Sequence, residues 1–205
     1  MRLLGLGGSQ KGFTLVELMQ VIAITAIIAI SFFAVFSVMN TGMSRSKTHF
    51  DINTSAKNII GRIANDAQEA IAVVPSYAGN VSGNTCLILK LPSIDANGIP
   101  LDITSLFDYV TYTIDGSDAS ILLRILAVNN GSSRNGGNNI AGAVAGKQVN
   151  AILFSGDGAN LGTIAANDLP WVKNIHIQVT TQGNAHGIIQ SSTVGSDFML
   201  RNNTL

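Results

Sequence analysis

The sequence predicts an α+β fold, in which a long N-terminal helix packs on an antiparallel β-sheet domain. Three observations predict it. Residues 18–39 form an uncharged, apolar run. An apolar stripe with helical spacing follows and continues to the proline at position 75. Beyond Pro75, short runs that alternate apolar and polar residues replace the helical pattern, as is typical of strands.

The uncharged run predicts a membrane span. Its 22 residues include one strongly polar side chain, Gln20, and as a helix they would reach roughly 33 Å, enough for a bilayer. The run exceeds the apolar region of about 7 to 15 residues of a cleaved secretory signal, and no convincing cleavage site follows it. We therefore expect a retained transmembrane helix over residues 13–39. Basic residues on both sides favour a cytoplasmic N-terminus only slightly.

The helix is expected to continue as an amphipathic segment over residues 40–75. One face carries apolar residues spaced three or four apart: Ile52, Ala56, Ile59, Ile63, Ala67, Ala70 and Val74. Polar residues, Asp66 and Glu69 among them, lie off this stripe. Gly42 could introduce a brief kink, and Pro75 should end a nearly continuous helix from Phe13 to Val74.

Residues 76–205 are expected to form the β domain. Six strands are predicted, over residues 85–92, 108–115, 119–128, 149–155, 171–181 and 196–202. A turn at 116–118 joins the second and third into a hairpin, and antiparallel pairing is favoured because no helices separate the runs. The Gly- and Asn-rich segment 129–146 is predicted to be a mobile loop.

Charge and cysteine content exclude some classes of protein. The chain has 12 basic and 12 acidic residues, so nucleic-acid binding has no bulk electrostatic support. One cysteine, Cys86, permits no intrachain disulfide, and its place in an apolar run predicts a buried strand thiol and not a reactive one.

Glu17 lies at the start of the apolar run, where a carboxylate is costly. Two interpretations are open. Glu17 could simply reach the lipid headgroups, or it could meet a cation inside an assembly.

The residues around Glu17 favour the second interpretation. The segment "KGFTLVEL", followed by a long apolar helix, resembles the class III signal of type IV pilins and pseudopilins. This resemblance implies that a prepilin peptidase removes a leader of residues 1–12 by cutting between Gly12 and Phe13, and methylates the new amine of Phe13. It also implies that Glu17 pairs with the Phe13 amine of a neighbouring subunit. The chain departs from many members in having no proline between Phe13 and Val74.

A second resemblance lies in the domain. The segments "YTIDGSDASILLR" and "DFMLRN" are similar to J-type minor pseudopilins and related minor pilins. Together the resemblances imply a pilin-like fold and a minor pseudopilin of a type II secretion pseudopilus, anchored in the bacterial inner membrane with a periplasmic domain. The implied partners are the prepilin peptidase, other pilin or pseudopilin subunits and an inner-membrane assembly platform. A minor pilin of a type IV pilus or a DNA-uptake system is the alternative.

The sequence gives little evidence for a catalytic, phosphate-binding or metal-binding site, and we expect no enzyme activity, cofactor or metal. The segment "GAVAGKQ" (142–148) lacks the spacing and the Ser or Thr of a phosphate loop. The three histidines have no ligand spacing. Asp157 and Asp168 could join a calcium loop, although turn aspartates are the simpler interpretation. A membrane-anchored enzyme or binding domain would need a convergent polar site, and an adhesive tip subunit would need exposed aromatics in 129–146; the sequence shows neither.

Overall fold

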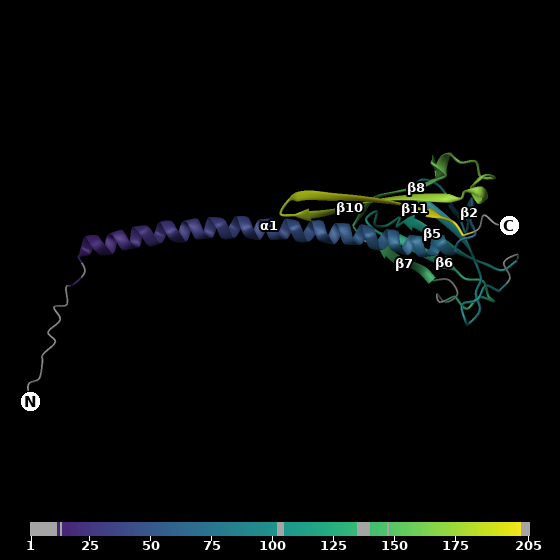
Figure 1. Ribbon diagram of the computed structural model, residues 1–205, viewed down its shortest axis with the longest axis horizontal. Coiled ribbons are helices and arrows are strands. Elements are labelled where there is room, and N and C mark those ends of the chain that lie inside the picture. The colour runs from purple at the N-terminus through teal and green to yellow at the C-terminus, as the bar shows by residue number, and fades with distance from the viewer. Residues whose placement is uncertain (1–11, 13, 102–104, 135–139, 147, 202–205) are drawn as a thin grey trace, which may run out of the picture. The chain divides into compact units, whose positions relative to one another are not determined.

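The computed structural model describes residues 12, 14–101, 105–134, 140–146 and 148–201, with side chains except at 140–146. The chain divides into two units, Met1–Arg45 and Ser46–Leu205. Helix α1 (Leu15–Glu69) has 55 residues and begins in the first unit (Figure 1). It runs without a break past Gly42, so this glycine does not interrupt the helix.

The second half of α1 is amphipathic, as predicted. Its buried side carries Ile52, Ala56, Ile59, Ile63 and Ala67. These positions lie on one side of a helix with 3.6 residues per turn, and burying their side chains is the main source of stability for this part of α1.

The predicted end of the helix was wrong by five residues. α1 ends at Glu69, because the next residues give their backbone groups to a strand instead. Strand β1 (Ala72–Val73) pairs with Lys90 and Leu89 of β4 (Cys86–Pro92). The N–H groups of Ile71 and Val74 also donate to carbonyls of that strand. Val74 is therefore only partly buried, and Val73 takes its predicted place in the core.

The first sheet contains five antiparallel strands in the order β1-β4-β5-β6-β7. Strands β5 (Phe107–Ile114) and β6 (Leu122–Ala127) form the predicted hairpin around the turn at 116–118. Strand β7 (Ile140–Gly146) pairs with β6, so part of the segment predicted to be a loop is a strand. A small hairpin, β2 (Ser76–Tyr77) with β3 (Asn80–Val81), lies before β4.

The second sheet has the order β11-β10-β8-β9 and is also antiparallel. It consists of β8 (Val149–Gly156), β9 (Ala159–Asn160), β10 (Asn174–Ala185) and β11 (Ile188–Met199). Two short 3₁₀ helices, η1 (Leu161–Thr163) and η2 (Leu169–Trp171), lie between β9 and β10. The predicted strands at 171–181 and 196–202 are thus parts of one long hairpin, most of whose second strand was missed.

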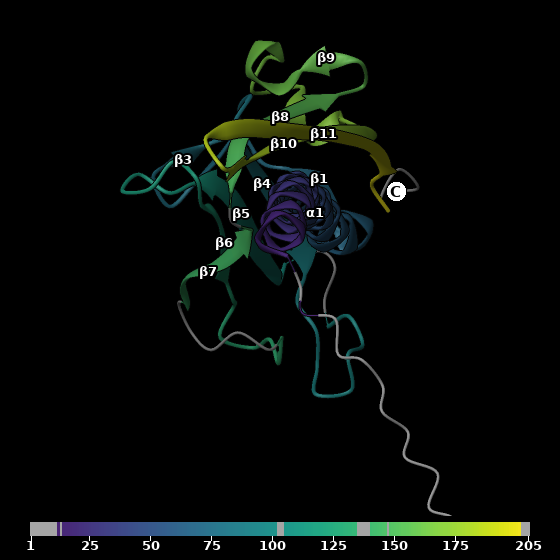
Figure 2. The ribbon, with the colours of Figure 1, turned by 90° about the vertical axis from the view of Figure 1, so that its left-hand side faces the viewer.

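Within the second unit, α1 packs against both sheets. Viewed along the helix, β8, β10 and β11 lie on one side of it and β5 to β7 on another (Figure 2). One core joins the three elements, since buried side chains of α1, β4, β5, β8 and β10 form a single cluster. The α+β fold with a long helix on antiparallel sheets is therefore confirmed.

A buried ion pair fixes the end of α1 to the first sheet. Asp66 accepts hydrogen bonds from Arg124 of β6 at 2.7 and 2.9 Å and from the hydroxyl of Tyr112 of β5 at 2.5 Å. Tyr112 and Arg124 are register partners. Burial, followed by the charge of Asp66, raises the pKa of Tyr112, so its hydroxyl stays a donor. Asp66 was predicted to lie off the apolar stripe, and it is nevertheless buried, because Arg124 neutralises it.

The segment after β6 is held by a second buried carboxylate, which corrects the prediction of a mobile loop for its first part. Asp108 of β5 is fully buried. It accepts hydrogen bonds from the Asn129 N–H at 2.9 Å, the Ser132 hydroxyl at 2.7 Å and Arg134 Nε at 3.0 Å. Arg134 also contacts Glu69 of α1 at 2.6 Å. Residues 129–134 are therefore a loop that is anchored to the first sheet by its contacts to Asp108.

Gly183 of β10 sets how closely the second sheet approaches α1. A Cβ atom at this position would lie 2.8 Å from Thr48 Cγ2 and 2.9 Å from Ile52 Cγ2. Nearby, the Thr181 hydroxyl donates to the Ile52 carbonyl at 2.8 Å. A side chain at position 183 therefore fits only if the Thr48 and Ile52 side chains, or the strand itself, move.

A Gly183→Val variant should therefore be destabilised by about 1–3 kcal/mol, the usual effect of overpacking. The melting temperature of the detergent-solubilised full chain would fall by roughly 2–10 °C. Gly116→Val is the matched control, because a Cβ at Gly116 meets nothing within 4 Å. Equal melting temperatures for the two variants would contradict the close approach.

Candidate functional site

The N-terminal turn of α1 is a capping box formed by Thr14 and Glu17. The Thr14 hydroxyl accepts from the Glu17 N–H at 3.3 Å. In return, a carboxylate oxygen of Glu17 accepts from the Thr14 N–H and hydroxyl, both at 2.9 Å. Two free N–H groups of the helix end are thereby satisfied, which is the usual effect of Ser or Thr followed three residues later by Glu.

The capping box was missed from the sequence, although the letters "TLVE" carry its signature. It gives Glu17 a partner inside its own chain. The carboxylate lies on an exposed helix end and remains open to a further donor, since a carboxylate has about four acceptor positions.

Gly12 precedes this turn and is exposed, with nothing within 4 Å of the position of a Cβ atom. None of the residues that the structure describes therefore restricts the side chain at position 12. Phe13 and the predicted leader up to residue 11 lie outside the described residues. The structure therefore brings Thr14 and Glu17 together and leaves the predicted roles of Gly12, Phe13 and Glu17 as predictions.

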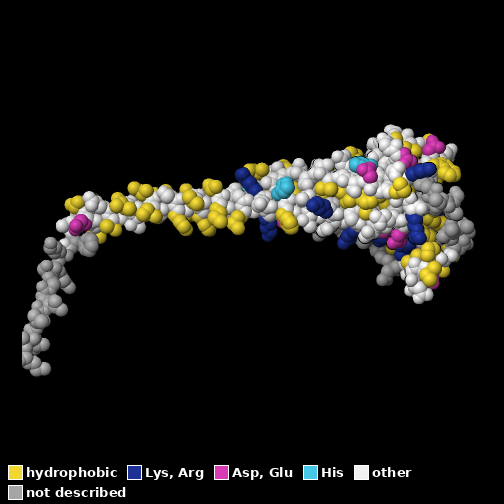
Figure 3. All heavy atoms as spheres, viewed as in Figure 1, with side chains coloured by type: hydrophobic (Ala, Val, Ile, Leu, Met, Phe, Trp, Pro, Cys, Tyr) yellow, Lys and Arg dark blue, Asp and Glu magenta, His cyan; other side chains and the backbone are white. Residues whose placement is uncertain are grey.

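The helix that follows presents apolar side chains to its surroundings. Every described residue from 14 to 40 is exposed, and hydrophobic side chains cover the first part of α1 on the face that Figure 3 shows. The most exposed of its aromatic side chains are Phe32 at 73% and Phe33 at 74%. The helix is long and apolar enough to cross a membrane. An apolar surface of this extent needs lipid or other helices around it.

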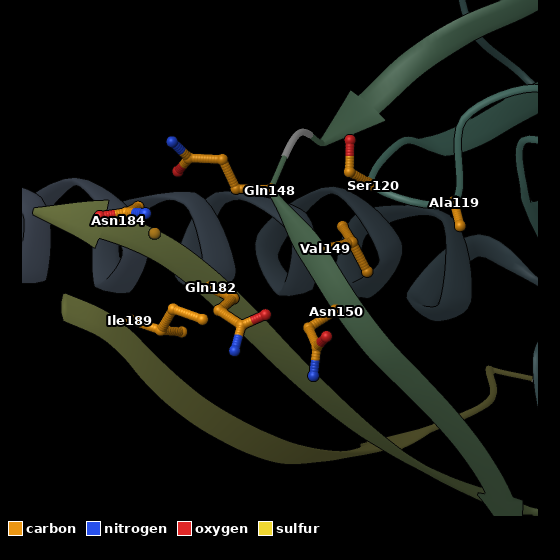
Figure 4. A pocket seen from close by; sticks show the side chains of 9 residues that line it. Ala119, Ser120, Gln148, Val149, Asn150, Gln182, Asn184 and Ile189 are labelled. Carbon is orange, nitrogen blue, oxygen red and sulfur yellow. The ribbon is translucent and has the colours of Figure 1, made fainter. Parts of the chain in front are cut away.

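A hollow of about 440 Å³ lies where the β5–β6 turn meets the second sheet. Its lining is uncharged and rich in amides: Ser120, Gln148, Asn150, Gln182 and Asn184 with Ala119, Val149, Gly183 and Ile189. Gln182 and Asn150 lie near each other, whereas Gln148 and Ser120 lie apart from them, near the start of β8 (Figure 4). The polar groups therefore do not converge on one point, as a catalytic centre requires.

The aspartates considered for calcium have separate surroundings. Asp157 accepts hydrogen bonds from the N–H groups of Lys173 and Asn174, both at 2.9 Å. Asp168 precedes η2 and makes no side-chain cap there. Among the described residues, no three His, Cys, Asp or Glu side chains are grouped to hold a metal ion.

The other residues singled out from the sequence have ordinary contacts. His176 lies 2.8 Å from Asp197 on the neighbouring strand, and His186 occupies the β10–β11 turn with a positive φ. Cys86 is in a strand as predicted, although half-buried, and burial raises the pKa of its thiol. Residues 142–146 of the supposed phosphate loop belong to β7, and Lys147 lies outside the described residues.

Comparison with known protein families finds a match at the N-terminal end of the described helix. Residues 8–33 match a family model described as the prokaryotic N-terminal methylation motif. The matched stretch contains Gly12, Thr14, Glu17 and much of the exposed apolar helix. No curated protein and no solved structure matches the chain.

Proposed function

We propose that this chain is a minor pseudopilin of a type II secretion pseudopilus, cut after Gly12 and assembled through its N-terminal helix. One observation carries the proposal: the methylation motif leads directly into a helix half whose apolar side chains are all exposed. The motif supports a type IV pilin-like or pseudopilin subunit, which is a structural protein and not an enzyme. It also implies processing by prepilin peptidase and assembly with other pilin subunits.

The mechanism follows from the chemistry of the helix end. Cleavage after Gly12 would create a cationic amine on Phe13, four residues before the carboxylate of Glu17. Glu17 would accept from the Phe13 amine of an adjacent subunit while keeping its contacts to Thr14. A carboxylate in an apolar bundle is tolerated when a cation neutralises it. The pair would thus fix the register of neighbouring helices, and the apolar side chains would supply the packing.

The location follows from the same features. The single apolar helix fits a protein anchored in the membrane by one span. We place the anchor in the bacterial inner membrane and residues 46–205 in the periplasm, where the domain would form the outside of a filament contacting an assembly platform at its base.

A Glu17→Gln variant tests the proposal. Glutamine keeps the size of the side chain and removes its charge. The variant should still be cut and methylated. It should, however, leave the Phe13 amine of the neighbouring subunit unpaired. The unpaired amine would lie in the apolar bundle, where an uncompensated charge is costly, so we expect at least roughly tenfold less protein in sheared filaments.

The matched control is Thr25→Val, which removes only a hydroxyl that bonds to the Val21 carbonyl of the same helix. Normal filaments from Glu17→Gln would overturn the assembly role. Separately, loss of protein secretion on deletion of the gene supports a pseudopilus. Loss of DNA uptake or pilus motility instead would assign the chain to the alternative, a minor pilin carrying the same motif.

A further inference from the structure

The part of α1 in the second unit has an uncovered face with unusual composition. Five exposed residues follow one another at intervals of three or four: Lys47, Phe50, Thr54, Lys57 and Gly61. This spacing places them on one side of the helix, opposite Ile52, Ile59 and Ile63 of the core. We call these five residues the open strip.

Two members of the open strip are not explained by contacts with the residues that the structure describes. Phe50 is 69% exposed, although it lies beyond the predicted membrane span. Gly61 lies inside the helix, where glycine is less favourable than alanine. A Cβ atom at Gly61 would meet nothing within 4 Å, so packing inside this chain does not require a glycine. An exposed aromatic side chain and a position without a side chain both suit a surface that another chain approaches closely.

A surface of complementary chemistry lies on the outer face of the second sheet. Leu153 of β8 is 45% exposed and Met199 of β11 is 70% exposed. Asp197, the one acid of β8, β10 and β11, has a side chain that is 79% exposed. In the register of the sheet, Ser155 and Asp197 flank His176, so these residues share one face. We call Leu153, Asp197 and Met199 the outer patch.

We propose that the open strip of one copy binds the outer patch of a second copy, with Phe50 against Met199 and a lysine of the strip beside Asp197. This inference rests on the proposed filament function and names one contact within it. The spacings agree: Lys47 and Phe50 are about 5 Å apart along a helix, and Asp197 and Met199 about 7 Å apart along a strand. Gly61 would let the strand backbone approach the helix.

The symmetry of the contact also agrees with a filament. The outer patch faces away from α1, because the inner face of the same sheet packs on the helix through Ile175, Ile177 and Val179. One copy can therefore use both surfaces at once, with two different neighbours. Such head-to-tail contacts are open-ended and build helical assemblies. A minor subunit, which is present in few copies, would use this contact only where two of its copies are neighbours in the filament.

Cross-linking of the full chain in membranes tests the contact directly. Copies labelled with ¹⁵N and unlabelled copies are co-expressed with the prepilin peptidase and treated with a carbodiimide. This reagent condenses a lysine amine with a carboxylate into an amide and is itself hydrated to a urea. We expect mixed-isotope peptides that join Lys47 or Lys57 to Asp197. Their absence, or joining of these lysines to a different protein, would overturn the inference.

Two substitutions at one position give the sharper readout. Gly61→Ala and Gly61→Leu should both raise the melting temperature by about 2–4 °C, because both improve helix propensity. Only the bulk of leucine should block the approach, so the mixed-isotope cross-link should fall at least roughly tenfold in Gly61→Leu and persist in Gly61→Ala. Equal cross-linking in the two variants would contradict the proposed contact.

The same preparations separate this inference from the proposed function. Sheared filaments report the function, whereas the cross-link forms wherever two copies meet in the membrane. Filaments without the lysine-to-Asp197 cross-link would refute only the contact. The cross-link without any filament would support the contact and refute the filament role.

Discussion

A Gly12→Glu variant is expected to accumulate with its leader attached. The structure allows this substitution, because Gly12 is exposed and a Cβ atom there meets nothing within 4 Å. The effect must therefore come from the peptidase. A glutamate side chain at position 12 would push the scissile carbonyl away from the catalytic groups of the peptidase. A misplacement of about 1 Å can slow a reaction roughly 100-fold. We expect cleavage to slow by at least roughly this factor, and assembly to fail with it.

The measurement is the intact mass and N-terminal fragmentation of the membrane-extracted protein. The parent should begin at an N-methylated Phe13, and Gly12→Glu at the original terminus. Gly8→Glu serves as the control, since it adds the same charge to the leader away from the bond to be cut. A parent that still carries its leader, or that is cut near residue 40, would contradict the processing site and the filament proposal with it.

Local pattern was sufficient to predict α1 and its buried side. The apolar spacing from Ile52 to Ala67 reports a single helix face, so burial follows from geometry alone. The end of the helix could not be predicted in this way. Residues 70–74 continue the apolar spacing, but β4 offers their backbone groups partners, and β4 lies in a distant part of the chain.

The β10–β11 hairpin shows why the strands were harder to predict. Around the turn, the face toward α1 carries Thr181 and Gly183 with Gln190 and Ser192 opposite them, so no apolar alternation is visible. Small or polar residues occur there because the helix approaches so closely at Gly183. The turn did leave one signal in the sequence, Gly187, because such a two-residue turn needs positive φ, which His186 and Gly187 both have in the structure.

In the candidate site too, residues that are neighbours in the sequence were predicted, and contacts between distant residues were not. Glu17, Gly12 and Phe13 were singled out because they are close together in the sequence and resemble a known signal. Thr14 was accessible to the same reasoning and was missed. The buried carboxylates were not accessible, because Asp66 meets Arg124 across 58 residues and Asp108 meets Arg134 across 26. An isolated acid in a sequence gives no indication of a partner so far away.

Removal of the Asp108 carboxylate should have the largest effect on stability. Asp108 is fully buried and accepts hydrogen bonds from four groups, the Ser93 hydroxyl included, whereas the Asp66 side chain is 11% exposed. Asp108→Ala would leave Arg134 buried without this partner and Asn129 N–H without an acceptor. Breaking a buried pair on one side costs about 3–5 kcal/mol. We expect the melting temperature of the full chain to fall by roughly 6–20 °C.

Two further variants make this prediction specific. Asp108→Asn keeps the shape but turns an amide donor toward donors, so it should recover little of the loss. Asp118→Ala is the matched control: its carboxylate also accepts from a serine hydroxyl and an N–H group, but in an exposed turn where water can replace it, so its melting temperature should change little. A small effect of Asp108→Ala, equal to that of Asp118→Ala, would mean that residues 129–134 are held by other contacts. A large and selective effect would establish that one carboxylate of β5 fixes both this segment and, through Arg134 and Glu69, the C-terminal end of α1.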